Sequence, residues 1–461
     1  MDIEAYDVVI IGTGQSGKPL ALDLAAAGWR TAIVERDEVG GTCINVGCTP
    51  TKTMIASGRV AHLARRHAEY GVSMSDAITV DLAAVLRRKR EVVQQFRDAG
   101  VRALQEAPNV SLLFGEARFV DAQTLDVAMR GGDVRRVRAP NIVVDTGARP
   151  AVPPIQGLDS SPYLDSTTIM ELDTLPGHLI VLGGGYIGLE FGQLFRRFGS
   201  AVTIVNRDER LVSREDPDVS QAVESIFAED GIAVRNRAQV ERVEGTEGGV
   251  IVRTRTPAGV DTVRGTHLLI ALGRTPNTDR LNLPAAGVTT DKSGYIEVDA
   301  RLATRVPGIY AVGDVKGGPA FTHVSYDDYR VLRDNWLHGA NRTVEGRLVP
   351  NTVFIDPQLA TVGINETEAQ RRGLDVRVAR LPMSRVARAI ETGETRGFMK
   401  AIVDARSGCI LGCTVLGVDG GEVMAMLEIA MLAGLPYAKL REAIFAHPTL
   451  AEALNNLFAT L

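Results

Sequence analysis

The sequence is poor in cysteine, in net charge and in long apolar runs, and each shortage excludes a class of protein. Four cysteines in 461 residues are too few for a secreted fold built on disulfides, and they indicate a reducing compartment. A formal net charge of −5, carried by interspersed residues, argues against nucleic acid or an anionic membrane as a partner. No apolar run approaches the ~18 residues that span a bilayer, and from the acidic start we expect no signal peptide. We therefore expect a soluble, cytoplasmic protein.

The chain, by contrast, is long and rich in glycine. A chain of 461 residues is too long for one ordinary core and predicts about three domains. Hydrophobic residues make up 45% of it, which is typical of a globular protein. Its 47 glycines are about a tenth of the chain, above the usual share of ~7%. This excess suits a protein with several turns that cradle phosphate groups.

Two of the four cysteines lie close together in the segment 40–52, Gly-Gly-Thr-Cys-Ile-Asn-Val-Gly-Cys-Thr-Pro-Thr-Lys. Cys43 and Cys48 are too far apart for a thioredoxin-type Cys-x-x-Cys, and we expect no metal site here. A redox dithiol is the interpretation that we prefer. Cys48 falls at the start of a predicted helix, where free amide groups and the helix dipole favour a thiolate. Taken alone, the pair also fits two buried apolar side chains.

A dinucleotide-binding unit precedes this pair. An apolar strand at 7–11 leads into a glycine-rich turn, an alanine-rich helix and a second strand at 31–35 that ends in Glu35. The glycines of the turn are Gly12, Gly14 and Gly17. This order of elements is the context that distinguishes a dinucleotide fingerprint from an ordinary turn. We expect the turn to hold a pyrophosphate at the helix N-terminus and Glu35 to hold ribose hydroxyls. Because the cysteine pair follows at once, FAD is the expected nucleotide.

The same unit recurs at 179–205, which predicts a second dinucleotide site. Its strand at 179–182 is followed by a glycine turn, a helix at 189–198 and a strand at 201–205. The turn contains Gly183, Gly185 and Gly188. Where an acid would hold the ribose hydroxyls of NAD, the chain has Asn206 and Arg207, which favours the 2′-phosphate of NADPH. Arginines that are merely exposed would give the same pattern.

Other segments predict the remaining elements. Residues 60–106 have a helical pattern, and strands are expected at 110–119, 124–129, 352–355, 376–381, 397–403 and 410–415. The segment 141–150 is expected to be a strand that ends in a glycine turn. Two apolar helices follow the last strands. Cys409 and Cys413 are expected in the core of this C-terminal region.

Together these motifs resemble the flavoprotein disulfide reductases, the family of lipoamide dehydrogenase, glutathione reductase and mercuric reductase. The resemblance covers essentially the whole chain, including Ile309-Tyr-Ala-Val-Gly-Asp-Val315 and Phe445-Ala-His-Pro-Thr-Leu-Ala-Glu452. It implies an α/β fold with two Rossmann-like dinucleotide-binding domains and a C-terminal α+β dimerisation domain. The implied boundaries are 1–150 and 276–346 for the two parts of the FAD domain, 151–275 for the NAD(P)H domain and 347–461 for the interface domain.

The resemblance also implies roles for single residues at the dithiol. Cys43 would attack the substrate, and Cys48, nearer the flavin, would form a charge-transfer thiolate. Lys52 would pair with Glu190 beside flavin N5, and Tyr186 would cover the flavin until nicotinamide displaces it. Without the resemblance to the family, the sequence alone also fits Glu190 and Tyr186 as residues on the surface of a helix.

Further contacts are implied at the substrate and at the flavin. His447 would act as general acid–base, oriented by Glu452, and would serve the dithiol of the other subunit of a homodimer. Asp314 would contact the ribitol, although an Asp at a strand end is more often a helix cap. The remaining implied cofactor contacts are Gly41, Thr42, Lys52, Thr146, Gly147 and Gly273.

Departures from individual members narrow the choice. Mercuric reductases and high-molecular-weight thioredoxin reductases carry a C-terminal cysteine pair, which is absent from the ending Phe458-Ala-Thr-Leu461. Typical lipoamide dehydrogenases have an acid where Asn206 stands, and soluble transhydrogenases lack the dithiol. The closest likeness is to the mercuric-reductase-like branch that includes the bacterial reactive-chlorine-resistance flavoproteins, which are linked to copper(II) reduction and oxidant defence.

We therefore expect a homodimeric FAD enzyme that passes electrons from NADPH, with NADH also possible, through flavin to the Cys43–Cys48 disulfide. The expected substrate is a small-molecule or small-protein disulfide. Alternatives are a reductase of Cu(II), Hg(II) or reactive oxidants that uses the same dithiol, an activity like that of dihydrolipoamide dehydrogenase, and a non-catalytic flavoprotein subunit of a larger complex.

Overall fold

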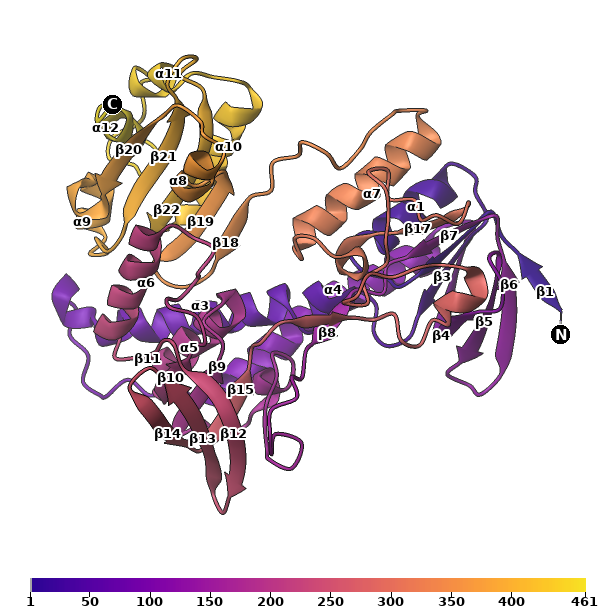
Figure 1. The fold of residues 1–461 in the computed structure, drawn as a ribbon, viewed down its shortest axis with the longest axis horizontal. Helices are drawn as coiled ribbons and strands as arrows, with labels where there is room; N and C mark the ends of the chain where they lie inside the picture. The colour runs from indigo at the N-terminus through magenta and orange to yellow at the C-terminus, as the bar shows by residue number, and fades with distance from the viewer. Residues whose placement is uncertain (1) are drawn as a thin grey trace. The chain divides into compact units, whose positions relative to one another are not determined.

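The computed structural model describes residues 2–461, which form two compact units (Figure 1). Unit 1 comprises the described parts of Met1–Thr53, Ala84–Ala151 and Gly273–Arg347. Unit 2 comprises Met54–Ala83, Val152–Leu272 and Leu348–Leu461. In the described residues, no helix is both long enough and apolar enough to cross a membrane.

Unit 1 is built on an eight-stranded sheet in the order β1-β6-β5-β4-β3-β2-β7-β17. Its strands are β1 (Ile3–Ala5), β2 (Val8–Ile11), β3 (Thr31–Glu35), β4 (Val110–Phe119), β5 (Thr124–Met129), β6 (Val134–Arg138), β7 (Asn141–Val144) and β17 (Ile309–Ala311). The parallel centre of this sheet is buried on both faces, because alternate side chains of β2 enter different cores. Val9 and Ile11 pack in one core, and Val8 and Ile10 pack in the other.

Helices complete unit 1. They are α1 (Gly17–Ala26), α2 (Gly41–Asn45), α7 (Thr322–Leu337), most of α4 (Leu82–Glu106), the first turns of α3 (Cys48–Arg65), and the short 3-10 helices η3 (Leu283–Ala286) and η4 (Gly313–Lys316). A two-stranded ribbon of β8 (Ala148–Pro150) and β16 (Arg274–Pro276) also belongs to this unit. Helices α1 and α7 pack against each other and share a core with one face of the sheet, as Figure 1 shows. The glycine turn before α1 therefore opens at the carboxyl end of β2, where open α/β sheets bind ligands.

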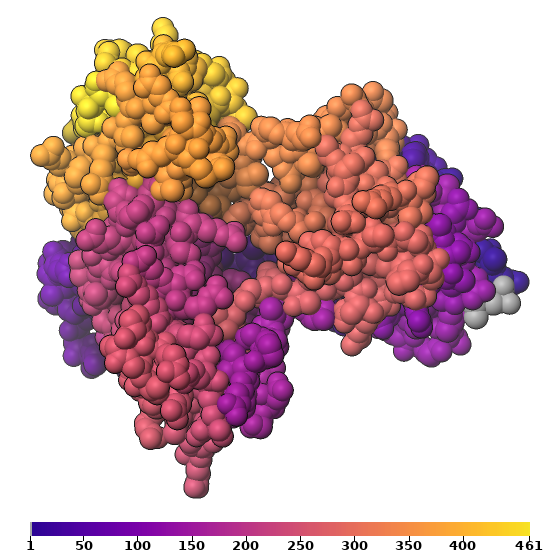
Figure 2. Space-filling view, in the orientation of Figure 1, coloured from indigo at the N-terminus to yellow at the C-terminus, as the bar shows by residue number. Residues whose placement is uncertain are grey.

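The first part of unit 2 repeats this design on a smaller scale. A parallel sheet in the order β11-β10-β9-β15 carries α5 (Tyr186–Phe198) and α6 (Pro217–Glu229). A separate antiparallel sheet, β12-β13-β14, has an end that protrudes into solvent (Figure 2). The strands are β9 (His178–Leu182), β10 (Ala201–Val205), β11 (Ala233–Arg235), β12 (Gln239–Thr246), β13 (Gly249–Thr256), β14 (Gly259–Gly265) and β15 (His267–Ile270).

The C-terminal part of unit 2 is a five-stranded antiparallel sheet in the order β18-β19-β22-β21-β20. It consists of β18 (Asn351–Val353), β19 (Gln358–Gly363), β20 (Val376–Pro382), β21 (Phe398–Asp404) and β22 (Ile410–Gly417), with α8 (Glu366–Arg371), α9 (Ala387–Glu391), α10 (Gly420–Leu432), α11 (Tyr437–Arg441) and α12 (Ala453–Phe458). The sheet and α10 enclose one hydrophobic core.

The expected α/β fold class is confirmed, and several elements have the expected bounds. Strands β4, β5 and β10 begin and end where the sequence predicts them. The helical stretch predicted at 60–106 is wrong as a single element, because α3 ends at Arg65 and α4 begins only at Leu82. The intervening residues 71–81 lack the apolar spacing of a helix. Cys413 is buried as expected, whereas Cys409 lies just outside β22 and is only partly buried.

Candidate active site

The cysteine pair lies at the junction of two helices in unit 1. Cys43 belongs to α2, a short helix that the sequence pattern did not predict. Cys48 is the first residue of α3. No disulfide bond joins the two sulfurs in the structure, and Cys48 is the more exposed of the two. Gly40, at a φ of 114°, makes the turn into α2, where a Cβ would approach Ile44 to 2.8 Å. The turn therefore requires glycine.

Contact between the two sulfurs makes them unequal. The pKa of Cys43 is raised, first by a hydrogen bond with Cys48 and then by burial. A charge on Cys48 is a further cause that raises the pKa of Cys43, so Cys43 keeps its proton when Cys48 is ionised. The pair can thus hold one thiol and one thiolate side by side, which is the reduced form that disulfide exchange requires.

Thr322 is a member of this site that the sequence pattern did not indicate. Its hydroxyl oxygen lies 3.2 Å from the sulfur of Cys48, although 274 residues separate them in the chain. Thr322 is also the first residue of α7, so the N-terminal end of that helix lies at the same place. The hydroxyl and the positive helix end both favour negative charge on the sulfur.

The first glycine turn has the shape of a phosphate cradle. A Cβ at Gly12, where φ is 107°, would collide with the backbone oxygen of Asp145, and a Cβ at Gly14 would lie 2.7 Å from Oδ2 of Asp145. Only glycine fits this turn, which opens onto the N-terminus of α1. Glu35 closes it by accepting hydrogen bonds from the Thr13 amide at 3.1 Å and the Thr13 hydroxyl at 2.5 Å. The residues present fit the diphosphate and ribose of FAD.

Asp145 lies directly beneath this cradle, and the sequence pattern did not indicate it. Its side chain accepts a hydrogen bond from the Gly17 amide at 2.8 Å and is 7% exposed. Burial raises the pKa of Asp145 well above its ordinary value, and the nearby acids Asp314, Asp328 and Glu35 raise it further. Burial therefore favours the protonated, neutral form of a carboxyl beneath the diphosphate site.

The other expected flavin contacts also belong to unit 1. A Cβ at Gly41 would lie 2.8 Å from Cα of Gly14, so the cysteine segment begins against the phosphate cradle. The Thr146 hydroxyl donates to the carbonyl of Asn277 at 2.9 Å, which fixes the turn that contains Gly147. Asp314 lies 3.7 Å from Nε of Arg274, and burial raises the pKa of Asp314.

The remaining expected contacts occupy the same neighbourhood. A Cβ on Gly147 would come within 4.0 Å of the Thr42 hydroxyl. Gly273 accepts a hydrogen bond from the Ala151 amide at 3.0 Å. Lys52 lies in the second turn of α3, and its pairing with Glu190 stays a prediction.

The second glycine turn has the same form within unit 2. A Cβ at Gly183 or Gly188 would collide with backbone oxygen atoms, whereas at Gly185 there is open space. Asn206 is buried, and its amide donates to Asn236 Oδ1 at 2.9 Å and to the Arg210 carbonyl at 3.0 Å. Asn206 therefore shapes the loop, while the Arg207 side chain, 76% exposed, is the group that can reach a ligand phosphate.

The first turns of α5 carry Tyr186 and Glu190, and neither is a simple surface residue. Oε1 of Glu190 accepts a hydrogen bond from the Phe354 amide at 2.8 Å, and the side chain is buried. The Tyr186 hydroxyl donates to Oε1 of Glu215 at 2.9 Å. Both side chains therefore have fixed positions in unit 2.

The structure brings His447 and Glu452 together just before α12. The two carboxylate oxygens of Glu452 lie 2.8 and 3.0 Å from Nδ1 of His447, and the imidazole is 69% exposed. A proton on Nδ1 satisfies this contact, which leaves Nε2 to exchange protons with a ligand. The arrangement is that of a general acid–base dyad.

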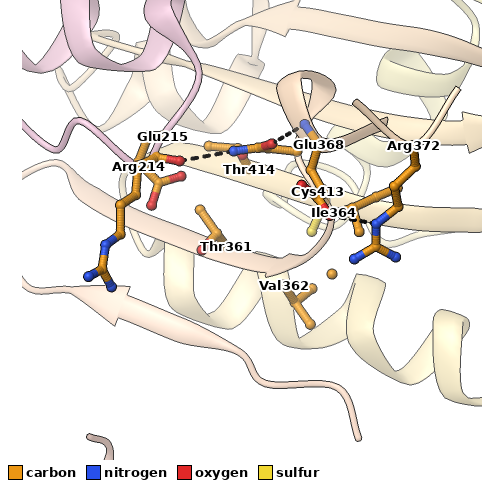
Figure 3. A pocket seen from close by; sticks show the side chains of 11 residues that line it. Arg214, Glu215, Thr361, Val362, Ile364, Glu368, Arg372, Cys413 and Thr414 are labelled. Carbon is orange, nitrogen blue, oxygen red and sulfur yellow. Dashed lines mark hydrogen bonds and ion pairs between the residues drawn. The ribbon is translucent and has the colours of Figure 1, made fainter. Parts of the chain in front are cut away.

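A polar cavity of about 250 Å³ lies elsewhere in unit 2, between the loop before α6 and the elements β19, β22 and α8 (Figure 3). The Asn365 amide spans it, donating to the carbonyl of Arg214 at 3.1 Å and accepting from the amide of Glu368 at 2.8 Å. Arg372 pairs with Glu368 at 2.5 Å. These lining groups bond to one another, so they do not by themselves identify a ligand.

Comparisons with known proteins agree with this geometry. The model of the family described as "Pyridine nucleotide-disulphide oxidoreductase" matches residues 6–328, and the dimerisation domain of that family matches residues 349–458. The "Probable pyridine nucleotide-disulfide oxidoreductase RclA" of Escherichia coli is 40% identical over 98% of this chain and 99% of its own length. A mercuric reductase of Lysinibacillus sphaericus is 38% identical over 98% of this chain and 81% of its own length.

A solved structure is similar throughout. The Cu(II) complex of the "HOCl-induced flavoprotein disulfide reductase RclA" of Escherichia coli has a TM-score of 0.90 and 38% identity, over 98% of this chain and 100% of that chain. Similarity therefore extends over every segment that contributes to the candidate site.

Proposed function

Because this chain belongs to the pyridine nucleotide-disulphide oxidoreductase family, we propose that it passes electrons from NADPH through FAD to the Cys43–Cys48 pair and on to a disulfide substrate. The single observation that carries the proposal is the contact of Cys48 with both Cys43 and Thr322. That arrangement favours one thiolate in the reduced pair and leaves the other thiol protonated. The flavin, when bound, supplies the two-electron relay between the nicotinamide nucleotide and the cysteines.

The different chemical roles of Cys43 and Cys48 follow from their surroundings. Cys43, whose pKa is raised, needs a base to become a nucleophile, and the His447–Glu452 dyad is the base that we assign to it. Cys43 attacks one sulfur of the substrate disulfide, and the departing thiol takes the proton from the imidazole. The Cys48 thiolate then attacks the Cys43 sulfur, which forms the Cys43–Cys48 disulfide and releases the second substrate sulfur as a thiolate that takes a proton from water.

The cofactors are assigned to the two glycine turns. FAD belongs to the cradle of Gly12, Gly14 and Gly17, closed by Glu35. NADPH belongs to the turn of Gly183, Gly185 and Gly188, where the exposed Arg207 favours a 2′-phosphate over two ribose hydroxyls. NADH remains the alternative donor. We assign the active form to a homodimer, in accord with the matched dimerisation domain.

A second candidate function is reduction of Cu(II), Hg(II) or a reactive oxidant by the same dithiol. Two adjacent thiols, one of them exposed, are soft ligands that suit Cu(I) and Hg(II). Two of the similar proteins bear names that point the same way, one as a mercuric reductase and one as an HOCl-induced reductase with Cu(II) bound. In this case the metal ion is the substrate and the cysteines are its electron donors.

Nicotinamide turnover with a panel of oxidants tests the proposal. Oxidation of NADPH is measured with small disulfides, lipoamide-type disulfides, a small protein disulfide, Cu(II), Hg(II) and hypochlorite, each with wild type, Cys43→Ser and Cys48→Ser. We expect turnover with a disulfide that both substitutions abolish. Turnover with Cu(II) or Hg(II) alone would favour the second candidate, and no turnover with any oxidant would favour a non-catalytic subunit.

A further inference from the structure

A buried glutamate holds the hydroxyl group of Tyr186. The Tyr186 hydroxyl donates to Oε1 of Glu215 at 2.9 Å, and Glu215 is 8% exposed. Burial is the first cause that raises the pKa of Glu215 and also the pKa of Tyr186, so water does not screen the bond well. Arg214, Asp216 and Lys400 are the charged groups that face the pair, and Asn351 bonds to the Tyr186 hydroxyl from β18.

The backbone at Glu215 is fixed by contacts that do not involve the ring of Tyr186. Its amide donates to the Val212 carbonyl at 2.8 Å. The next residue, Asp216, is 2% exposed and pairs with Lys400 at 2.7 Å. Figure 3 shows the Glu215 side chain beside Arg214 on the wall of the cavity, where it is held between the loop and the neighbouring sheet.

The loop that carries Glu215 also contacts the second glycine turn. It connects β10 to α6, begins with Asn206 and Arg207, and ends at Asp216. Midway, the Val212 amide donates to the carbonyl of Gly184 at 2.9 Å. One short segment therefore contains the residue assigned to the 2′-phosphate, a contact to the phosphate turn and the acceptor for Tyr186.

We propose that Glu215 is a positioning residue, which fixes Tyr186 in the place from which the nicotinamide ring must displace it. This inference rests on the proposed function and on the role that the family resemblance implies for Tyr186, which is to cover the flavin until the nucleotide arrives. Because the backbone of Glu215 is held by Val212 and the next residue by Lys400, displacement of the tyrosine ring breaks the hydrogen bond. Glu215 therefore weakens nucleotide binding and keeps the tyrosine in place between turnovers.

A double-mutant cycle tests this assignment. The dissociation constant of NADPH is taken from the concentration dependence of flavin reduction in stopped flow, for wild type, Tyr186→Phe, Glu215→Ala and the double variant. We expect each single substitution to lower the dissociation constant about tenfold, because a hydrogen bond to a buried carboxylate is lost. The double variant should be no tighter than either single variant, because both break the same bond.

Two control variants test whether the change in the dissociation constant comes from the Tyr186–Glu215 hydrogen bond or from a general disturbance of the fold. Glu215→Gln keeps an acceptor oxygen and should remain within about twofold of wild type. Glu229→Gln, on the exposed side of α6, should not change the dissociation constant. Additive effects, or a dissociation constant that rises in Tyr186→Phe, would overturn the proposal.

The outcome also distinguishes this inference from the proposed function. If NADPH and NADH both fail to reduce the flavin of the wild type, the proposed function fails. If the wild type is reduced normally and the cycle shows no coupling, only the role of Glu215 fails. Should Glu215→Ala not fold, an unchanged dissociation constant in Tyr186→Phe would still contradict the role.

Discussion

At the scale of single residues, Asp145 gives the protein a distinctive dependence on pH. The folded state raises the pKa of this carboxyl, so the folded protein binds a proton that the unfolded chain has already lost. Stability must therefore fall as pH rises from the ordinary carboxyl value of about 3.9 towards the raised one. The ionised form also faces the site of a diphosphate, so retention of FAD should fall in the same pH window.

Asp145→Asn should remove this dependence. The amide oxygen still accepts from Gly17, whereas no charge develops. We expect the variant to match wild type at acidic pH and to exceed it in melting temperature and in FAD retained after ultrafiltration as pH rises. Asp121→Asn is the control, because the pKa of the exposed Asp121 is lowered and its replacement gives no such gain. Parallel pH profiles for wild type and Asp145→Asn would contradict the prediction.

The second prediction for a single residue concerns Arg207 and the preference for NADPH over NADH. Its side chain is 76% exposed and can close on a ligand phosphate. Arg207→Ala should raise the KM for NADPH by about tenfold or more, since an ion pair with a 2′-phosphate contributes about 1.5–3 kcal/mol. The KM for NADH should stay nearly unchanged. Arg235→Ala, on a half-exposed arginine of β11, is the matched control. Equal use of the two nucleotides by the wild type would refute it.

At the scale of elements, α3 and α7 meet at the reactive sulfur. Both begin there, with Cys48 and Thr322 as their first residues. We expect the reduced holoprotein to show the long-wavelength absorbance that a thiolate gives when it donates into bound flavin. Cys48→Ser should abolish this band and Cys43→Ser should keep it. The reverse result would exchange the two roles.

Thr322→Val isolates the contribution of the hydroxyl to that band. The substitution keeps the branched shape and removes the hydrogen bond at 3.2 Å. The pH at which the band is half developed should rise by about one to two units, as expected for a lost hydrogen bond to a charged group. Thr289→Val, on the exposed surface of the same unit, should leave the midpoint in place. An unmoved midpoint in Thr322→Val would show that the helix ends suffice.

The elements also show what sequence can and cannot predict. The glycine turns, β10 and the cysteine segment were predictable because their constraints are local: left-handed glycines, an apolar run and a helix start within a few residues. Thr322 was not predictable, because it meets Cys48 only through folding across 274 residues. Asp145 and Glu215 were missed for the same reason, since burial and distant partners create their roles.

Two helix boundaries were predicted wrongly. The prediction of one helix over residues 60–106 passed over Gly71, whose φ of 70° is typical of a helix end, and α5 begins three residues earlier than predicted, at Tyr186 instead of Leu189. The sheet β12-β13-β14 alternates polar and apolar residues but belongs to no motif, so it was not anticipated. Sequence motifs therefore predicted the local glycine turns more reliably than the helix boundaries and the sheets without a motif.

At the scale of the whole molecule, we predict that each active site is shared between two chains. The dimerisation domain matched at residues 349–458 contains His447 and Glu452, while the dithiol lies outside it. In a two-fold dimer, each site would then combine Cys43 and Cys48 of one chain with the partner subunit's His447 and Glu452. Size measurement should find a dimer, and a monomer that turns over a disulfide would contradict the shared site.

Mixing two inactive variants makes this prediction quantitative. Cys43→Ser chains are co-folded with His447→Ala chains, each homodimer being nearly inactive. In a mixed dimer one site receives both lesions, and the other receives an intact dithiol with an intact histidine. Random assembly makes about half of the dimers mixed, so activity per flavin should return to roughly a quarter of wild type. Mixing Cys43→Ser with Cys48→Ser is the matched control, because every site then has a damaged dithiol and activity stays absent. If His447 serves its own chain, the first mixture will be as inactive as the second.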